Sequence, residues 1–379
     1  MNDPIIVVGS GLAGYTVARE LRKLDRQAPL IMVTQDSGDF YSKPTLSNAF
    51  AQRKSPEQLV TTLAEGMAGQ LDMTLLKSTR VTSIDTAARV VASTVGEHRY
   101  RALVLAVGAD AICLPLAGDG AGDVLSVNDL ADYARFRAAV GAARRVAVIG
   151  AGLIGCEFAI DLAGAGYAVT VGDPTAYPLA NLLPEAAGRS LIGPLENAGV
   201  IWRFGRSVSS VDRIQGGYRL TLDDGSTLDA DAVLSAVGLR PRTALARAAG
   251  LAVNRGIVVD PYGCTSSEAV FALGDCAEYG GTVLPYVAPI MNGARALAQT
   301  LAGTPTAIVF PPMPVVVKTP ACPVAVLPPP RGAAGKWRVV ENGEGVKMTY
   351  TDVDERLQGF ALTGAKAAQR QAMVRLLPG

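Results

Sequence analysis

The sequence predicts an α/β fold in three parts, and three observations support this prediction. Of 379 residues, 49% are hydrophobic and 18% are charged, with 41 glycines. This composition suits buried parallel strands joined by tight glycine turns and excludes a disordered chain. A strand–turn–helix–strand pattern occurs twice, over residues 5–33 and 146–171. Beyond Pro311 the sequence becomes proline-rich and then alternates as in a small α+β domain. At about 150 residues per domain, the length allows two or three domains.

Each repeat places a G-x-G-x-x-G turn after an apolar strand and before a helix. In this context the first two glycines let the backbone turn and approach a pyrophosphate, and the third lets helix and strand pack. The N–H groups at the helix start then face the phosphates. Two such repeats predict two Rossmann-like dinucleotide-binding domains, whose turns contain Gly9, Ser10, Gly11, Leu12, Ala13 and Gly14 in the first and Gly150, Gly152, Leu153, Ile154 and Gly155 in the second.

The segments that follow each glycine repeat also resemble each other. After the first repeat, residues 80–93 alternate like a hairpin and residues 100–108 form a buried strand that ends on glycine. Residues 218–238 repeat this order after the second repeat. Residues 257–300 return to an α/β pattern, and short strands at 336–340 and 347–351 precede a helix from about Ala365. We therefore predict a first dinucleotide-binding domain at 1–109 and 239–311, a second at 110–238, and a C-terminal domain at 312–379.

The charge and the cysteine spacing exclude several classes of protein. Lys and Arg number 35 against 34 Asp and Glu, so the balance indicates no nucleic-acid or membrane surface. No two of the five cysteines are three apart, which excludes a C-x-x-C redox pair and a zinc knuckle, and we expect a reduced, cytoplasmic chain. The acidic start does not fit a signal peptide, and prolines interrupt the uncharged stretch at 296–317, unlike a membrane helix. His98, the only histidine, lies in a predicted charged loop, so we expect neither a catalytic triad nor a metal site.

Acidic residues follow the strands that should lie next to each glycine turn. Asp173 follows Gly155 by 18 residues, close to the about 20 residues at which an acid binds the adenosine ribose. No cation for a 2′-phosphate stands at 174–177, which favours NADH over NADPH. In the first repeat the strand runs into Thr34, a predicted cofactor contact, and we assign the ribose contact to either Gln35 or Asp36. Asp275 ends another strand before a predicted helical stretch, where it would accept hydrogen bonds from the polyol of a flavin or cap that helix.

These motifs resemble those of the two-dinucleotide flavoprotein reductases of the glutathione-reductase superfamily. Residues 106–108 (Ala-Val-Gly) stand in the A-T-G position, residues 236–241 in the G-x-R-P position, and residues 271–275 in the Y-A-x-G-D position. Val107 replaces the usual threonine. The resemblance covers about residues 1–310. It implies that the first repeat and Asp275 hold FAD and that the second repeat holds NAD(H).

The lack of a cysteine close to the expected flavin site reduces the number of possible electron acceptors. Relatives that reduce disulfides or peroxides need cysteine close to the flavin, whereas residues 41–47, Tyr-Ser-Lys-Pro-Thr-Leu-Ser, have none. Cys156 and Cys276 follow glycine turns, and we expect them to pack as small hydrophobic side chains. Residues 41–47 are similar to a segment of reductases that serve small iron proteins. Over the whole length the rubredoxin–NAD reductases match best, including the Lys-Thr-Pro segment at 318–320, while Asn48 replaces the lysine usual in ferredoxin reductases.

This resemblance implies roles that residue spacing does not give. Lys43 lies against the flavin and stabilises negative charge there. Glu157 faces flavin N5 and shapes the nicotinamide site, although a helix start favours an acid in any case. Lys318 lies near flavin N1 and O2, where it favours the reduced anion, or it extends to water from the end of an apolar strand. Val287 precedes a helix directed at flavin O2, and Val81 contacts the adenine. The other predicted cofactor contacts are Pro44, Ala106, Gly108 and Gly238.

The resemblance implies an FAD-dependent NADH:rubredoxin reductase. A hydride would pass from NADH to flavin N5, and two single electrons would pass on to rubredoxin, which we expect to supply an alkane hydroxylase. One alternative keeps the chemistry with a ferredoxin or flavorubredoxin as acceptor, in nitric oxide or oxygen detoxification. Another is a redox-sensing protein that binds FAD and NADH, as apoptosis-inducing-factor-like proteins do. We expect a monomer, with no nucleic acid and no membrane insertion.

Overall fold

The computed structural model describes residues 3–378. These residues form two compact units, and each unit contains one of the two glycine repeats. β10 (Ala109–Ala111) and β18 (Leu239–Pro241) pair where the chain passes between the units. The first unit contains the residues up to Ser42, Glu57–Asp110 and Leu239–Pro311, and the second contains Lys43–Pro56, Ala111–Gly238 and the residues from Pro312 onward.

A five-stranded parallel sheet forms the centre of the first unit, in the order β20-β9-β1-β2-β5. Its central strand pairs on both sides, Ile5 with Leu30 and with Ala102. All four side chains of that strand are buried, as expected for a parallel sheet covered on both faces. The strands are β1 (Ile5–Val8), β2 (Leu30–Val33), β5 (Thr74–Leu76), β9 (Ala102–Leu105) and β20 (Val270–Ala272).

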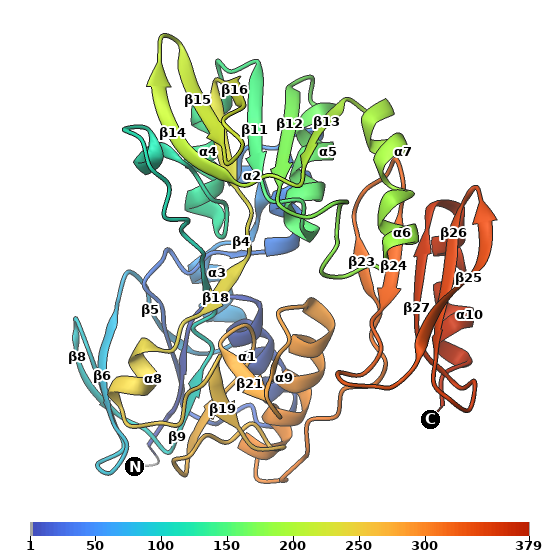
Figure 1. The fold of residues 1–379 in the computed structure, drawn as a ribbon. Helices are drawn as coiled ribbons and strands as arrows, with labels where there is room; N and C mark the ends of the chain where they lie inside the picture. Colours follow the sequence, from blue (N-terminus) through green and yellow to red (C-terminus); the bar gives the residue numbers. More distant parts are fainter. Residues whose placement is uncertain (1–2, 379) are drawn as a thin grey trace. The chain divides into compact units, whose positions relative to one another are not determined.

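Two helices, α1 (Leu12–Leu24) and α9 (Val287–Leu301), pack against each other and against one face of this sheet (Figure 1). Tyr15, Leu21 and Leu297 are fully buried in this core. The other face packs against a second core that the predicted hairpin supplies with Ile84 and Val91. Further elements of this unit are β3 (Phe40–Tyr41), α2 (Pro56–Leu59), β4 (Val60–Thr62), α3 (Ala64–Gln70), β6 (Val81–Asp85), β7 (Val90–Ser93), α8 (Ala244–Ala248) and β19 (Ile257–Val259).

Two sequence predictions in the first unit are wrong. His98 lies in the edge strand β8 (Gly96–Arg99), opposite Val91, and not in a loop. Its strand is polar because only one side of it pairs, so it lacks the apolar pattern of a buried strand. The stretch after Asp275 is not helical. It forms β21 (Ala277–Tyr279) and β22 (Thr282–Val283), which turn back on each other at two glycines with positive φ.

The second unit repeats the parallel arrangement with four strands, in the order β13-β12-β11-β17. α5 (Leu153–Gly164) packs on this sheet. The antiparallel β14-β15-β16 sheet packs Val211 and Leu220 against Ala147 and Ile149 of β11. The strands and the remaining helices are β11 (Arg145–Ile149), β12 (Ala168–Asp173), β13 (Val200–Phe204), β14 (Val208–Ile214), β15 (Gly217–Leu222), β16 (Thr227–Ala230), β17 (Ala232–Ser235), η1 (Lys43–Asn48), η2 (Ala121–Asp123), α4 (Leu130–Val140), α6 (Glu185–Arg189) and α7 (Ile192–Asn197).

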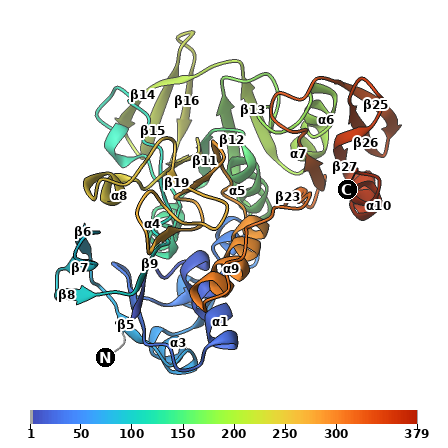
Figure 2. The ribbon, with the colours of Figure 1, turned by 90° about the horizontal axis from the view of Figure 1, so that it is seen from below.

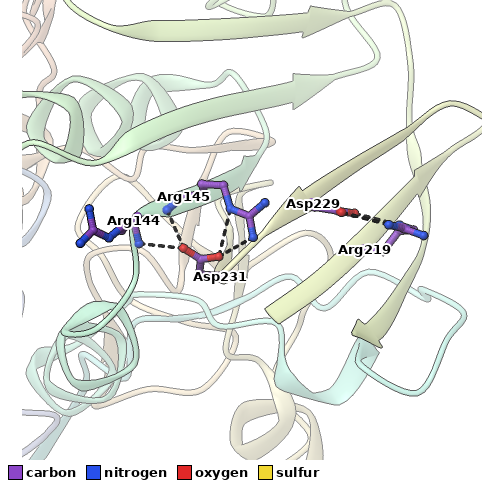
Figure 3. Close-up of polar contacts among 5 residues, drawn as sticks. All are labelled: Arg144, Arg145, Arg219, Asp229 and Asp231. Carbon is purple, nitrogen blue, oxygen red and sulfur yellow. Dashed lines mark hydrogen bonds and ion pairs between the residues drawn. The ribbon is translucent and has the colours of Figure 1, made fainter. Parts of the chain in front are cut away.

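Charged pairs fix the end of this sheet that lies opposite the glycine turn (Figure 3). The Asp231 carboxylate accepts hydrogen bonds from the backbone N–H groups of Arg144 and Arg145, at 2.7 and 2.9 Å, and also binds the Arg145 guanidinium. Arg219 and Asp229 form a second pair between neighbouring strands, at 2.8 Å. About half of each arginine side chain is exposed, so each pair contributes little to the stability of the fold.

The C-terminal part of the second unit is a five-stranded antiparallel sheet with a short helix against it (Figure 2). Phe360, Leu362 and Met373 form its core. The helix predicted from Ala365 begins as a 3₁₀ turn, and the central strand β27 was not predicted because its sequence is apolar without alternation. The elements are β23 (Val315–Val317), β24 (Val324–Leu327), β25 (Lys336–Gly343), β26 (Gly345–Thr351), β27 (Leu357–Thr363), η3 (Gly364–Gln369) and α10 (Arg370–Arg375).

No helix within residues 3–378 is long and apolar enough to span a bilayer. Over the same residues, no group of three or more His, Cys, Asp or Glu side chains is placed to hold a metal ion.

Candidate functional site

The three glycines of the first turn meet different surroundings. A Cβ on Gly9, whose φ is +113°, would stand 2.3 Å from the Ala106 carbonyl oxygen. A Cβ on Gly14 would stand 1.9 Å from the Gly9 carbonyl oxygen. A Cβ on Gly11 would meet no atom within 4 Å, and this residue is exposed. The outer glycines are therefore required by the packing of the chain itself, whereas the middle one leaves an open surface.

The second turn has the same geometry. A Cβ on Gly150 would stand 2.8 Å from the Ala236 carbonyl oxygen, and one on Gly155 would stand 1.9 Å from the Gly150 carbonyl oxygen. Gly152 again has nothing within 4 Å. Among the described residues, no side chain caps the start of α1 or α5, so the first N–H groups of both helices can bind an anion. Both turns thus fit a pyrophosphate, and Leu12, Ala13, Leu153 and Ile154 form the first helical turns behind them.

The acid of the first repeat lies against the glycine turn. The buried Ser10 hydroxyl donates a 2.8 Å hydrogen bond to Asp36 Oδ1, and the Thr34 hydroxyl donates one of 2.6 Å to the same atom. The Gly38 N–H also bonds to Oδ1, at 3.0 Å. Gln35 and Asp36 are both exposed. The hydrogen bonds bring Ser10, Thr34 and Asp36 together beside the turn.

Asp173 occupies the equivalent place in the second repeat. Its Oδ2 accepts a 2.6 Å hydrogen bond from the Ala151 N–H, inside the glycine turn. Its Oδ1 accepts bonds from the N–H and the hydroxyl of Thr175, at 2.8 and 2.5 Å. In both repeats, an acid at or just beyond the end of the second strand thus bonds to the residue that follows the first glycine.

The remaining predicted contacts of the first unit lie at the ends of its strands or at a helix start. Asp275 follows Gly274, whose φ is +85° and where a Cβ would stand 2.9 Å from the Cβ of Ala13 in α1. Asp275 therefore lies near the first glycine turn. Val287 is the first residue of α9 and is 43% exposed. Ala106 lies against Gly9, Gly108 has a φ of +72°, and Val81 begins β6. In the second unit, Gly238 has a φ of +111°.

The buried thiols are held in their protonated form. Burial raises the pKa of Cys276 to about 11 and raises that of Cys156 further. Both thiols are fully buried and lie 3.3 Å from backbone carbonyl oxygens. Burial also raises the pKa of Cys264 and Cys322. A thiolate is the reactive form of cysteine, so these four residues are unsuited to a thiol relay.

Glu157 is the centre of a cluster that joins three segments of the second unit. It lies in the second turn of α5, not at the helix start as predicted, and is only 1% exposed. The Ser47 hydroxyl, from η1, donates a 2.5 Å hydrogen bond to its Oε2. Lys318, which follows β23, donates its backbone N–H to Oε1 at 2.8 Å and places its ammonium 3.0 Å from Oε2. The buried carboxylate is therefore both paired and hydrogen-bonded, as a buried charge requires.

The Lys318 ammonium makes two further contacts in this cluster. It donates hydrogen bonds to the Pro44 carbonyl oxygen and, at 3.2 Å, to the Ser47 hydroxyl. Only 33% of its side-chain surface is exposed, so the alternative in which Lys318 extends freely into water is wrong. Lys43, half-buried, begins the same segment η1. The structure thus brings Lys43, Pro44, Glu157 and Lys318 to one place.

Sequence reasoning missed Asp161, which lies one helical turn beyond Glu157. Its carboxylate accepts hydrogen bonds from the backbone N–H groups of Phe50 and Ala51, at 2.8 and 3.0 Å. Burial raises the pKa of Asp161. The spacing of four residues places Glu157 and Asp161 on one face of an otherwise apolar helix. Two acids on one face of an apolar helix therefore indicate that the helix binds another segment there, which in this structure is residues 43–56.

Comparison with known proteins places this geometry in a family. Residues 3–300 match the family model for pyridine nucleotide-disulphide oxidoreductases, and residues 307–377 match that of a rubredoxin binding C-terminal domain. The chain is 45% identical to the rubredoxin-NAD(+) reductase of Alcanivorax borkumensis and 44% identical to that of Acinetobacter baylyi, each alignment covering 99% of this chain and 98% of the relative. It is 38% identical to the nitric oxide reductase FlRd-NAD(+) reductase of Aliivibrio fischeri, over 100% of this chain and 99% of the relative.

Among solved structures, the covalent putidaredoxin reductase–putidaredoxin complex is 26% identical to this chain, with a TM-score of 0.89. That match covers 100% of this chain and 94% of the other. The predicted fold class is confirmed by these matches, with two Rossmann-like domains and a small C-terminal domain. The chain belongs to the pyridine nucleotide-disulphide oxidoreductases and, within them, to the rubredoxin–NAD(+) reductases.

Proposed function

We propose that this chain is an FAD-dependent NADH:rubredoxin oxidoreductase. FAD and NAD(H) are the cofactors implied by its family. The observation that carries the proposal is the pair of glycine turns with one geometry, each open at its middle glycine, Gly11 or Gly152, and each with an acid beside it. When bound, FAD accepts two electrons from NADH at flavin N5 and can pass them to rubredoxin one at a time.

The first glycine turn would hold FAD. Its open backbone at Gly11 and the start of α1 suit the pyrophosphate. Asp36, rather than Gln35, would hold the ribose, because Ser10 and Thr34 orient its carboxylate beside the turn. The remaining FAD contacts that we propose are Gly9, Leu12, Ala13, Gly14, Lys43, Pro44, Val81, Ala106, Gly108, Asp275, Val287 and Lys318.

The second glycine turn would hold NADH. Asp173 is oriented from both sides, by Ala151 and by Thr175, and would accept hydrogen bonds from the ribose hydroxyls. Glu157 would shape the nicotinamide site, and its buried negative charge is balanced by Lys318. The other proposed contacts are Gly150, Gly152, Leu153, Ile154, Gly155 and Gly238. Because NADH is the donor, we place the enzyme in the cytoplasm.

Rubredoxin reduction tests this function directly. The purified holoenzyme with NADH should bleach oxidised rubredoxin at a rate far above that seen with a ferredoxin. The relatives at 38–40% identity that are named nitric oxide reductase FlRd-NAD(+) reductases favour a flavorubredoxin as the second candidate acceptor. A long-lived complex of NADH with the flavin, together with slow reduction of all three carriers, would instead indicate a redox-sensing protein. An alkane hydroxylase is the consumer that we propose for the reduced rubredoxin.

Replacement of all five cysteines by alanine should leave NADH-to-rubredoxin turnover within a few-fold of the native rate. The buried thiols are protonated and Cys113 stands alone at the surface, so none of them fits a relay between flavin and acceptor. Absorbance of the bound flavin controls for loss of the fold. A fall of several orders of magnitude with FAD still bound would contradict a route without thiols.

Asp173 should give at least about a 100-fold preference for NADH over NADPH in kcat/KM, because a charge-assisted hydrogen bond contributes about 1.5–3 kcal/mol. The same carboxylate repels a 2′-phosphate, so attraction and repulsion act together. Asp173→Ala should raise the KM for NADH and reduce the preference. Steady-state rates with both nucleotides at saturating rubredoxin measure it. Equal use of both nucleotides by the native enzyme would show that another residue binds the ribose.

A further inference from the structure

Two arginines from other parts of the chain lie near residues 173–177, although residues 174–177 contain no cation themselves. The Arg189 guanidinium lies 5.9 Å from the ring centre of Tyr177 and pairs with Glu185 at 2.7 Å. Arg206 comes closer, because it follows β13, the strand that lies beside β12. Arg206 also forms an ion pair, with Asp224.

The backbone of Arg206 is fixed next to Asp173. Phe204, the last residue of β13, is in register with Asp173. The Gly205 N–H then donates a 2.9 Å hydrogen bond to the Thr175 carbonyl oxygen, and the Arg206 N–H lies 3.4 Å from the Asp173 carbonyl oxygen. The Arg206 side chain therefore starts from a backbone position next to Asp173, and an extended arginine is long enough to approach the Asp173 carboxylate from there.

The Arg206 guanidinium is instead bound by Asp224. This residue lies in the turn between β15 and β16, and its Oδ2 accepts a 2.7 Å hydrogen bond from Arg206 Nε. Its Oδ1 accepts two bonds from Ser226, at 3.0 and 2.6 Å, so the carboxylate is fixed before it meets the arginine. These bonds, first from Ser226 and then from Arg206, lower the pKa of Asp224 to about 2. The acid is therefore ionised at neutral pH.

We propose that Asp224 is a specificity-determining residue, because its ion pair with Arg206 withholds the cation that would otherwise lie beside the 2′-phosphate of NADPH. The enzyme would then reject NADPH in two ways: Asp173 repels the 2′-phosphate, and Asp224 keeps the Arg206 guanidinium away from it. The inference rests on the proposed function, since it places the adenosine ribose at Asp173. Arg206 is about half exposed, so it can change partner at little cost in packing.

The test measures the dissociation constants of NAD⁺ and NADP⁺ for the oxidised holoenzyme by calorimetry. Asp224→Asn should lower the dissociation constant for NADP⁺ about fivefold relative to that for NAD⁺. Asp223→Asn is the matched control: it makes the same charge change one residue away, where the carboxylate accepts a hydrogen bond from the Ser207 N–H and forms no ion pair among the described residues. The double variant Asp224→Asn/Arg206→Ala should lose the gain. Added salt should also reduce the gain, because the released guanidinium is exposed.

An equal gain in Asp223→Asn would overturn the proposal in favour of net charge alone. A gain that survives removal of Arg206 would overturn it as well, as would no gain in Asp224→Asn. Asp173→Ala, measured in parallel, separates this failure from failure of the proposed site. If Asp173→Ala weakens NAD⁺ binding while Asp224→Asn changes neither dissociation constant, the proposed ribose site is supported and the proposed role of Asp224 is wrong. If NAD⁺ binding is unaffected by Asp173→Ala, the ribose lies elsewhere.

Discussion

Gly14→Ala is expected to lower the unfolding free energy of the FAD-free protein by at least about 3 kcal/mol. The added Cβ would stand 1.9 Å from the Gly9 carbonyl oxygen and 3.2 Å from a Val7 methyl carbon. Both are atoms of the central strand and its turn, so neither can move unless α1 separates from the sheet. Urea unfolding of the FAD-free protein, followed by circular dichroism, measures this loss.

Gly11→Ala is the matched control within the same turn. Its φ of −71° suits alanine, and a Cβ there meets no protein atom within 4 Å. The FAD-free protein should therefore lose only about 0.5–1 kcal/mol, because alanine caps a helix less well than glycine. FAD affinity should fall at least about tenfold, since the methyl group occupies the approach of the pyrophosphate. If Gly11→Ala retained native FAD affinity, the open surface at this turn would not be the cofactor site.

The glycine turns and their strands could be predicted from sequence because everything that forms them is local. An apolar run, three glycines at fixed spacing and a helix lie within about 30 residues. The acid at Asp173 could be found for the same reason, at a fixed distance along the chain from Gly155. The choice between Gln35 and Asp36 could not, because it depends on the direction in which the Ser10 and Thr34 hydroxyls point.

The contacts that link distant segments could not be predicted. Nothing in the sequence around Glu157 shows that Ser47 and Lys318 meet there, because these residues are joined only by tertiary packing. The pair of Arg206 and Asp224 escaped the search for a cation at 174–177 for the same reason: β13 brings the arginine in from a parallel neighbour. Spacing along the chain predicts the residues within one repeat. It does not predict which residues a neighbouring strand brings into contact with that repeat.

Lys318→Met is expected to lower the unfolding free energy by about 2 kcal/mol. Removing one partner from a buried ion pair costs about 3–5 kcal/mol, and a third of the Lys318 side chain remains in contact with water, which reduces the loss. Glu157 would keep the Ser47 hydroxyl and the backbone N–H of residue 318, but it would lose the Lys318 ammonium. Combining Lys318→Met with Glu157→Gln should recover part of the loss, since the pair is coupled. Strict additivity of the two variants would show that the ion pair contributes nothing.

The flavin reduction potential distinguishes a site role for this pair from a purely structural one. If the cluster lies beside the flavin, as we propose, Lys318→Ala should lower the potential, because the cation that stabilises the reduced anion is lost. Glu157→Gln should raise it, because the negative charge that offsets that cation is lost. Coulomb terms of about 1–4 kcal/mol apply to charges at such short range. Lys318→Arg should stay near the native potential. A disturbance of packing alone would shift the potential in the same direction in both variants or leave it unchanged, so opposite signs are the decisive outcome of a redox titration.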